Sequence, residues 1–192
     1  TYNVAGLPEA LSGSSPSVNT PQISPMLNPY ELVLVQEDFW YHHELAAQVD
    51  HAYRSKPMRE RPGLLRMGDG LNRFSAFPLG ALTRVAWIEC NGVLDCDNDC
   101  LTTKGFSVSD IQLADGLALD VYNLHMDAGG CEGDIRARGI QTEKLLEKIR
   151  TRSVGRAVIV AGDTNLKRSR PDDVESLERL LSEANMREAC LF

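Results

Sequence analysis

The chain has 192 residues, of which 43% are hydrophobic and 24% are charged, and its formal net charge at pH 7 is −7. A chain of this length can bury a substantial core in one domain, and its composition is that of an ordinary globular protein. No segment approaches the roughly 18 consecutive apolar residues of a membrane span, and the acidic charge argues against tight, sequence-independent binding of nucleic acid.

The N-terminal part contains two predicted strands that carry polar residues. Residues 1–7 are strand-like and include Asn3, and residues 30–37 contain the run Leu-Val-Leu-Val before Glu37. A carboxylate at the point where a buried strand reaches the surface suits a hard cation such as Mg²⁺. Residues 8–29 are rich in Ser, Pro and Asn, which predicts a long loop.

The next segments alternate between regular structure and loop. Residues 41–53 have the periodicity of a helix, and residues 83–89 alternate as a strand does. Residues 56–72 are basic and rich in Gly and Pro, and such charge is usually solvated. The same solvated position is expected for Asp38, directly after the second strand.

Five cysteines are present, three of them between residues 90 and 100. In a loop rich in Asp, Asn and Gly they favour disulfide bonds in an oxidising compartment. A zinc site is the alternative, but the Cys-x-x-x-Cys spacing lacks the usual paired ligands. The sequence leaves the connectivity open, and the odd cysteine leaves one thiol over or a partner elsewhere. The disulfide candidates are Cys90, Cys96, Cys100 and Cys131.

Two further strands, residues 104–113 and 117–127, are joined by the tight-turn signal Ala-Asp-Gly. With a period of two residues, Asn123 and His125 lie on the same face as the apolar residues of the second strand. We expect the polar end of that face to reach a functional site.

The C-terminal part contains the most strand-like run in the chain. Residues 136–150 have the pattern of an amphipathic helix, and residues 157–161 form a strand that we expect to be buried on both faces. Gly162 ends this strand and is followed by Asp163 and Asn165, which we expect to be aimed at one point. A second amphipathic helix opens at Pro171, and alternating strands and helices indicate an α/β sandwich.

Five short segments occur in a fixed order along the chain. The segments are Thr1-Tyr2-Asn3-Val4, Val33-Leu34-Val35-Gln36-Glu37, Lys104-Gly105-Phe106, Asn123-Leu124-His125-Met126-Asp127 and Gly162-Asp163-Thr164-Asn165. Together they resemble the endonuclease/exonuclease/phosphatase superfamily, which includes deoxyribonuclease I, abasic-site endonucleases, sphingomyelinases and inositol-polyphosphate phosphatases. An ordered match of five parts is far more specific than any one of them.

The resemblance implies the fold and the active site. The fold is a four-layered α/β sandwich, in which helices flank two facing mixed β-sheets, formed by residues 1–192 as one domain. The cofactor that the resemblance implies is Mg²⁺, with Mn²⁺ or Ca²⁺ as alternatives. The resemblance assigns Glu37 and Asn3 to the metal, His125, Asp163 and Asn165 to catalysis, and Asn72 and Arg73 to the substrate phosphate.

The implied activity is hydrolysis of a phosphoester, either a lipid headgroup or nucleic acid. The segment Cys-Leu-Thr-Thr-Lys-Gly-Phe resembles the L-x-x-K-G segment of sphingomyelinase-like members, which favours a phosphodiesterase of that kind. The acidic net charge and the expected disulfide bonds also fit a secreted or periplasmic enzyme. The alternatives are a Mg²⁺-dependent endonuclease and a binding module without activity. The oligomeric state is left open.

One part of the family pattern is missing from this sequence. Family members usually continue through further strands to an Asp-His pair, whereas this chain ends at Phe192 and contains no such pair. We therefore expect the fold to be incomplete at its C-terminus.

Overall fold

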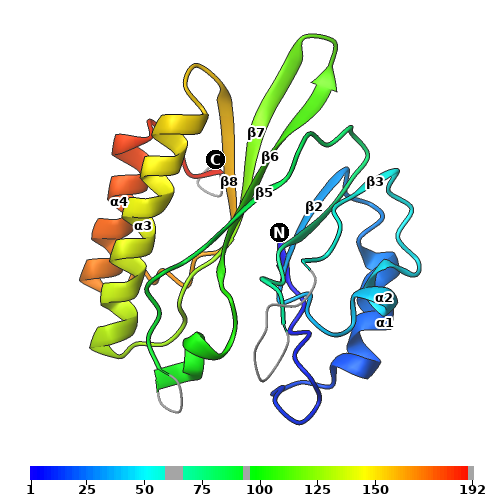
Figure 1. The fold of residues 1–192 in the computed structure, drawn as a ribbon, viewed down its shortest axis with the longest axis horizontal. Coiled ribbons are helices and arrows are strands. Elements are labelled where there is room, and N and C mark those ends of the chain that lie inside the picture. Colours follow the sequence, from blue (N-terminus) through cyan, green and yellow to red (C-terminus); the bar gives the residue numbers. More distant parts are fainter. Residues whose placement is uncertain (59–66, 93–95, 190–192) are drawn as a thin grey trace.

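The computed structural model describes residues 1–58, 67–92 and 96–189, apart from the side chains of Asp97 and Asn98. Two four-stranded mixed β-sheets face each other, and a pair of helices covers the outer face of each sheet (Figure 1). The predicted four-layered α/β sandwich is therefore confirmed.

The first sheet is built mainly from the N-terminal part of the chain. Its strand order is β1-β2-β4-β3, with β1 parallel to β2 and the other pairs antiparallel. The strands are β1 (Tyr2–Asn3), β2 (Leu32–Gln36), β3 (Tyr53–Arg54) and β4 (Asn72–Ser75).

The second sheet has the order β5-β6-β7-β8, and only β7 and β8 are parallel. In that pair His125 lies opposite Asp163. The parallel pairing places the ends of both strands at the same edge of the sheet, which brings their polar residues together. The strands are β5 (Thr83–Ala86), β6 (Gly105–Ala114), β7 (Leu117–His125) and β8 (Ala157–Asp163).

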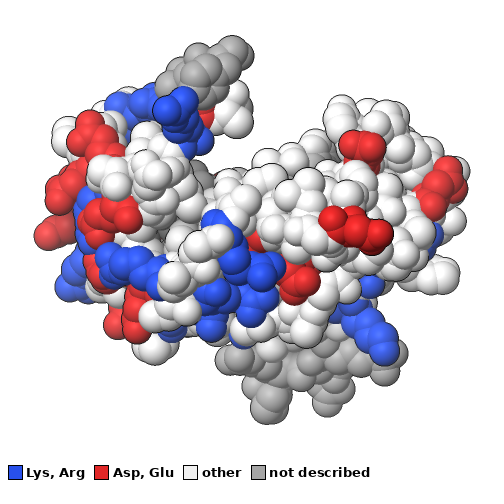
Figure 2. All heavy atoms as spheres, turned by 90° about the horizontal axis from the view of Figure 1, so that it is seen from above, with Lys and Arg blue, Asp and Glu red and all other residues white. Residues whose placement is uncertain are grey.

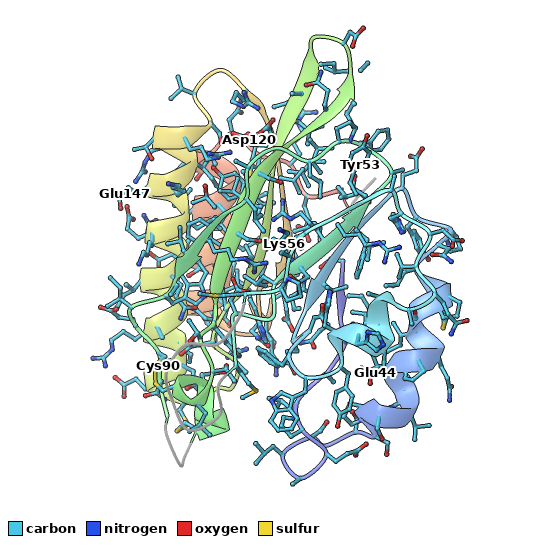
Figure 3. The ribbon with its side chains drawn as sticks, turned by 45° about the vertical axis from the view of Figure 1, so that its right-hand side comes forward. Glu44, Tyr53, Lys56, Cys90, Asp120 and Glu147 are labelled. Atoms are coloured by element: carbon cyan, nitrogen blue, oxygen red, sulfur yellow. A yellow bond between two sulfur atoms is a disulfide. The ribbon has the colours of Figure 1, made fainter. Side chains whose placement is uncertain are left out.

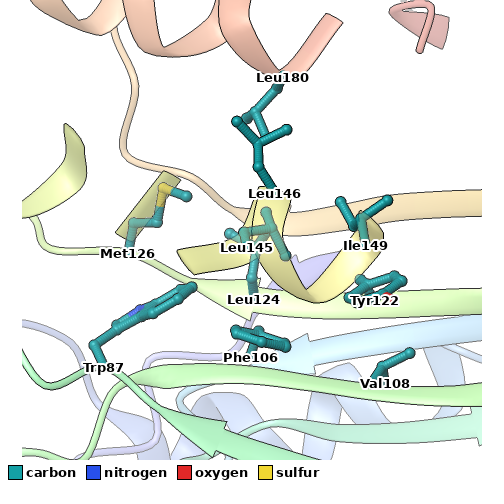
Figure 4. Packing of buried hydrophobic residues seen from close by; sticks show 10 residues of the cluster. All are labelled: Trp87, Phe106, Val108, Tyr122, Leu124, Met126, Leu145, Leu146, Ile149 and Leu180. Atoms are coloured by element: carbon teal, nitrogen blue, oxygen red, sulfur yellow. The ribbon is translucent and has the colours of Figure 1, made fainter. Parts of the chain in front are cut away.

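Helices α3 (Glu132–Arg152) and α4 (Pro171–Glu183) cover the second sheet. The predicted opening of the last helix at Pro171 is confirmed, and its proline occupies the first helical turn. The largest core cluster consists of ten buried apolar side chains (Figure 4). They come from the second sheet and the residues next to its strands, including Trp87, and from the two helices. A second cluster joins the first sheet to its helices, and a third lies between the sheets.

The prediction of a long loop over residues 8–29 is wrong for its second half, where helix α1 (Pro16–Met26) forms. Pro16 is tolerated because the first helical N–H groups need no partner within the helix. Ser24 is fully buried, and its Oγ accepts a hydrogen bond of 2.9 Å from the amide of Gln48 beyond α2. Tertiary packing thus overrides the poor helix propensity of this segment.

Helix α2 (His42–Ala46) is shorter than the helix predicted over residues 41–53. The side chain of Arg54 donates hydrogen bonds to the carbonyl oxygens of Ala46 and Val49. These bonds satisfy carbonyl groups that another helical turn would otherwise have used.

Strand β8 is not buried on both faces, contrary to the prediction. It is the edge strand of the second sheet, and Ile159 is 45% exposed. Val158 and Val160 pack against the core below α3 and α4. The strand is apolar because one of its faces packs against the helices. Among the residues that the structure describes, no strand pairs with the outer edge of β8.

The predicted disulfide bonds are confirmed and their connectivity is resolved. Cys90 pairs with Cys100, and Cys96 pairs with Cys131, with Cα–Cα distances of 5.4 and 6.0 Å. The second bridge ties the short helix Cys96–Leu101 to the residue that caps α3. Figure 3 labels Cys90 in this loop, and Cys190 lies outside the described residues.

Charge is distributed unevenly over the surface. Viewed from above, the Lys and Arg side chains gather near the middle of one face, with Asp and Glu around them (Figure 2). None of the helices in the described part of the chain is long and apolar enough to cross a membrane.

Candidate active site

Four side chains from the two facing sheets converge at one end of the sandwich. Asn3 ends β1, Glu37 follows β2, and His125 and Asp163 end β7 and β8. Strands β1 and β2 both contact β8 across the interface between the sheets. Residues separated by up to 160 positions in the sequence thus form one group, which we call the cleft cluster.

Asn3 holds the two carboxylates of the cleft cluster together. Its Nδ2 donates hydrogen bonds to Glu37 Oε1 at 2.9 Å and to Asp163 Oδ2 at 3.1 Å. Its Oδ1 accepts a bond of 3.0 Å from the amide of Ala5, which fixes the orientation of the amide group. Two carboxylates on one donor repel each other, and a cation between them would offset that repulsion.

His125 faces both carboxylates from the interior. Its Nε2 lies 3.8 Å from Glu37 Oε1 and 3.9 Å from Asp163 Oδ2, and the side chain is 2% exposed. Burial and the positive charge of Lys104 together lower the pKa of His125 to about 3, although the negative charge of Asp163 partly offsets both effects. The imidazole is therefore neutral at pH 7 and does not compensate the negative charge of the cluster.

Asn165 lies beside the cluster at the end of the β8 turn. Its backbone has a φ of 51°, and its amide nitrogen donates a 3.2 Å bond to Asp163 Oδ1. Its side-chain Nδ2 donates to the carbonyl oxygen of Met126 at 3.0 Å. The turn therefore orients Asp163 and places a side-chain amide next to His125.

Arg73 lies apart from the cleft cluster, in the interior between the two sheets. Its side chain donates hydrogen bonds to Ser109 Oγ at 2.7 Å, Ser107 Oγ at 2.7 Å and the carbonyl oxygen of Val121 at 3.2 Å. These contacts join the first sheet to the second. The contacts give Arg73 a structural role. The assignment of Arg73 to the substrate phosphate stays a prediction.

Asn72 is also buried, and it supports the segment after β2. Its Nδ2 donates a 2.8 Å bond to Asp38 Oδ2, and the same carboxylate oxygen is paired with His42. Asp38 is 4% exposed, so its predicted solvated position is wrong. The carboxylate is buried because two polar partners satisfy it, and this arrangement holds the chain next to Glu37. The role of Asn72 at the substrate phosphate stays a prediction.

Glu37 has a left-handed backbone conformation with a φ of 58°, which is uncommon for a residue other than glycine. Its carbonyl oxygen accepts hydrogen bonds from Gly6 and Phe39, at 3.0 and 2.9 Å. A Cβ atom on Gly70 would lie 2.7 Å from the Phe39 ring and 3.0 Å from Glu37 Cα. The close packing around this residue fixes the direction in which its carboxylate points.

Gly162→Ala is expected to displace Asp163 and to destabilise the β7–β8 pair. Gly162 has a φ of 140°, and a Cβ atom there would lie 2.1 Å from the carbonyl oxygen of Leu124. A backbone contact cannot give way as a flexible side chain can, so we expect a loss of roughly 2 kcal/mol or more in unfolding free energy. Thermal unfolding would measure it, with Gly155→Ala as the control for a left-handed glycine in open space. Equal melting temperatures for the two variants would contradict the prediction.

A cavity of about 440 Å³ opens onto the cleft cluster and is lined by both polar and apolar residues. Lys104 forms a salt bridge with Asp99 in its wall, and its Nζ donates a 3.3 Å bond to the carbonyl oxygen of Met126. The sequence contained Lys104 within the L-x-x-K-G segment, but its position in the cleft was not predicted. The apolar lining residues are Leu7, Leu11, Phe39, Met67 and Leu101.

The oxygen atoms of the cluster suit a hard divalent cation. Mg²⁺ typically binds one or two carboxylates and completes its shell with water and phosphate oxygens. Glu37 and Asp163 provide such carboxylates, since both approach the Asn3 amide and both are partly exposed. Among the described residues, no group of three or more His, Cys, Asp and Glu side chains is arranged as a metal site of its own. The residues present therefore fit Mg²⁺ better than a fully protein-ligated ion such as structural Zn²⁺.

No family model matches the chain. In sequence it is 38% identical over 184 residues to the sphingomyelinases of Mycobacterium bovis and Mycobacterium tuberculosis, a match that covers 92% of this chain and 35% of each relative. The chain thus spans about a third of the length of these curated relatives.

Solved structures share the fold at lower sequence identity. Sphingomyelinase C from Streptomyces griseocarneus superposes with a TM-score of 0.75 at 17% identity, over 98% of this chain and 69% of that one. A beta toxin double mutant from Staphylococcus aureus with bound magnesium ions gives 0.74 at 17% identity, over 97% and 69%.

Proposed function

Because the chain has the fold of the endonuclease/exonuclease/phosphatase superfamily and is similar in sequence to sphingomyelinases, we propose that it forms the active site of a divalent-metal-dependent phosphodiesterase acting on a lipid headgroup. The observation that carries this proposal is the cleft cluster. It holds two carboxylates on one amide, and both Glu37 and the neutral His125 line a cavity.

Glu37 and Asp163 would hold the metal, with Asn3 keeping their carboxylates in place. A bound Mg²⁺ supplies Lewis-acid stabilisation of the charge that develops on the phosphoryl oxygens. One beta toxin structure contains magnesium ions, which supports this choice of cation over Mn²⁺ or Ca²⁺.

The other groups orient the substrate and the attacking water. Asp163 is anchored by the amide of Asn165, so one carboxylate oxygen can accept the proton of a water molecule in line with the scissile bond. His125 stays neutral, and we assign its Nε2 to the phosphoryl oxygen, since this nitrogen faces the carboxylates. Asn165 would donate its remaining amide hydrogen to the same phosphoryl group.

The cavity favours a lipid over a nucleic acid. Half of its wall is apolar, with Phe39, Met67 and Leu101 beside the cleft cluster, and these side chains suit the non-polar part of a lipid. Lys104 would attract the phosphate of a headgroup. The net charge of −7 disfavours a polyanion such as DNA. The two disulfide bonds are consistent with a secreted or periplasmic protein.

Parallel assays test the proposal and its alternatives. The purified protein is incubated with sphingomyelin vesicles, plasmid DNA and bis(4-nitrophenyl) phosphate, each with Mg²⁺ and with EDTA. We expect Mg²⁺-dependent release of phosphocholine that EDTA abolishes and added Mg²⁺ restores. Plasmid cleavage without sphingomyelin hydrolysis would instead favour an endonuclease. Inactivity on all three substrates would favour a binding module without catalysis.

A further inference from the structure

A second cavity of about 360 Å³ lies on the opposite side of the sandwich from the contact between β1 and β8. It is bounded by β3, β4, β5 and β6, and we call it the β3–β5 pocket. Figure 3 labels Lys56 at this side of the strands. None of the cleft cluster lines this pocket. Its polar lining residues are Arg54, Ser55, Lys56, Arg73, Arg84 and Ser109.

Four cations line the β3–β5 pocket in a protein that is acidic as a whole. Asp69 pairs with Arg84. Within residues 1–58, 67–92 and 96–189 the structure pairs no carboxylate with Arg54, Lys56 or Arg73. Asp110 lies against Gly80 at the margin of the pocket and is 4.0 Å from Arg152, outside it.

Arg73 forms the buried base of this pocket. Its side chain is 1% exposed, and its two terminal nitrogens bond to Ser107, Ser109 and a backbone carbonyl, all of them uncharged. Its Nε has no hydrogen-bond partner in the described structure. Burial and the nearby positive charge of Arg84 lower the pKa of Arg73 to about 9, although the negative charge of Asp69 partly offsets both effects. A buried cation without a carboxylate partner is costly, and an anion in the adjoining pocket would offset that cost.

We propose that the β3–β5 pocket binds a phosphate group, carried by a small soluble compound or by an anionic lipid headgroup. The pocket has the size of a small-ligand site, since such sites begin at about 300 Å³. Guanidinium and ammonium groups form charge-assisted hydrogen bonds to phosphate oxygens, and the hydroxyl groups of Ser55 and Ser109 add further polar partners. Several cations around one cavity suit a group with more than one negative charge better than a carboxylate.

Lys56 is the position at which this site can be tested. Its side chain is exposed, so a substitution leaves no buried group without a partner. Arg84 is unsuitable because it also donates a 3.0 Å bond to Asn72, which holds Asp38 next to Glu37. Lys148 on the outer helix α3 provides a control with the same change of charge.

The test is a titration of the purified protein with inorganic phosphate in the presence of EDTA, followed by the NMR shifts of its backbone amides. No turnover is measured, so the result does not depend on the proposed hydrolase activity. We expect saturable shifts at Ser55, Leu82 and Ser109, and binding that is about 10-fold weaker in Lys56→Glu but unchanged in Lys148→Glu. Shifts that do not saturate, or equal affinities of Lys56→Glu and the unaltered protein, would overturn the proposal.

Sedimentation with vesicles distinguishes the two sources of the phosphate group. The vesicles contain phosphatidylcholine alone or phosphatidylcholine with phosphatidic acid. Binding that requires phosphatidic acid and is lost in Lys56→Glu identifies a lipid headgroup. Saturable binding of inorganic phosphate without vesicle binding identifies a soluble phosphate compound. If neither probe binds at this pocket, the proposal is wrong.

Discussion

Asp163→Ala is expected to lower kcat for phosphodiester hydrolysis by at least about 100-fold while leaving the fold intact. The substitution removes the carboxylate that faces His125 and accepts hydrogen bonds from Asn3 and Asn165. It also removes one of two like charges held on a single amide. The melting temperature should therefore stay the same or rise, as is common when a functional group under electrostatic strain is removed. Steady-state kinetics with sphingomyelin vesicles and thermal unfolding measure the two effects.

Asp115→Ala is the matched control, since Asp115 is exposed in the turn between β6 and β7. We expect its kcat and melting temperature to equal those of the unaltered protein. Full turnover in Asp163→Ala would show that this carboxylate has no part in catalysis. A large fall in its melting temperature would show a structural role instead.

Arg138→Ala is expected to destabilise the protein by roughly 3–5 kcal/mol, because it removes a buried ionic partner of the Asp173 carboxylate, which keeps only its contacts with Arg170 and the Lys167 amide. The Arg138 side chain is fully buried on α3, and its Nε donates a 2.9 Å bond to Asp173 at the start of α4. Its Nη1 binds the carbonyl oxygens of Asp127 and Ala128, both at 2.9 Å. One side chain thus fixes α3, α4 and the loop after β7.

Thermal unfolding would measure this loss, as a fall of roughly 10 °C in melting temperature for a chain of this size. Arg136→Ala on the same helix is the control, since its side chain is exposed and should change the melting temperature little. Asp173→Ala should be about as damaging as Arg138→Ala, and the double variant should be less unstable than the sum of the two. Strict additivity would contradict a direct pairing.

The elements with strong periodicity could be predicted from the sequence. The β6–β7 hairpin, the β8 strand and helices α3 and α4 all formed where apolar residues recur with the period of a strand or a helix. Helix α1 could not be predicted, since its residues are poor helix formers. It depends on contacts with α2 and on the hydrogen bond from Gln48 to Ser24, which no local pattern encodes.

The candidate site shows the same division. The polar residues at strand ends were visible in the sequence, and the structure brings Asn3, Glu37, His125 and Asp163 together with Asn165 beside them. Their catalytic and metal-binding roles remain predictions. The sequence could not show that Arg73 is enclosed between the sheets or that Asn72 is buried beside Asp38, because burial of a polar side chain depends on partners that are distant in the chain.

The sequence by itself determined the strongly periodic strands and helices and the polar residues at the strand ends, because these follow from local periodicity and side-chain chemistry. Only the tertiary structure decided which cysteines pair, that two carboxylates share the Asn3 amide, and that Lys104 enters the cleft while Arg73 joins the sheets. These outcomes depend on the distances between segments far apart in the chain, which the packing of two sheets sets and no local pattern contains.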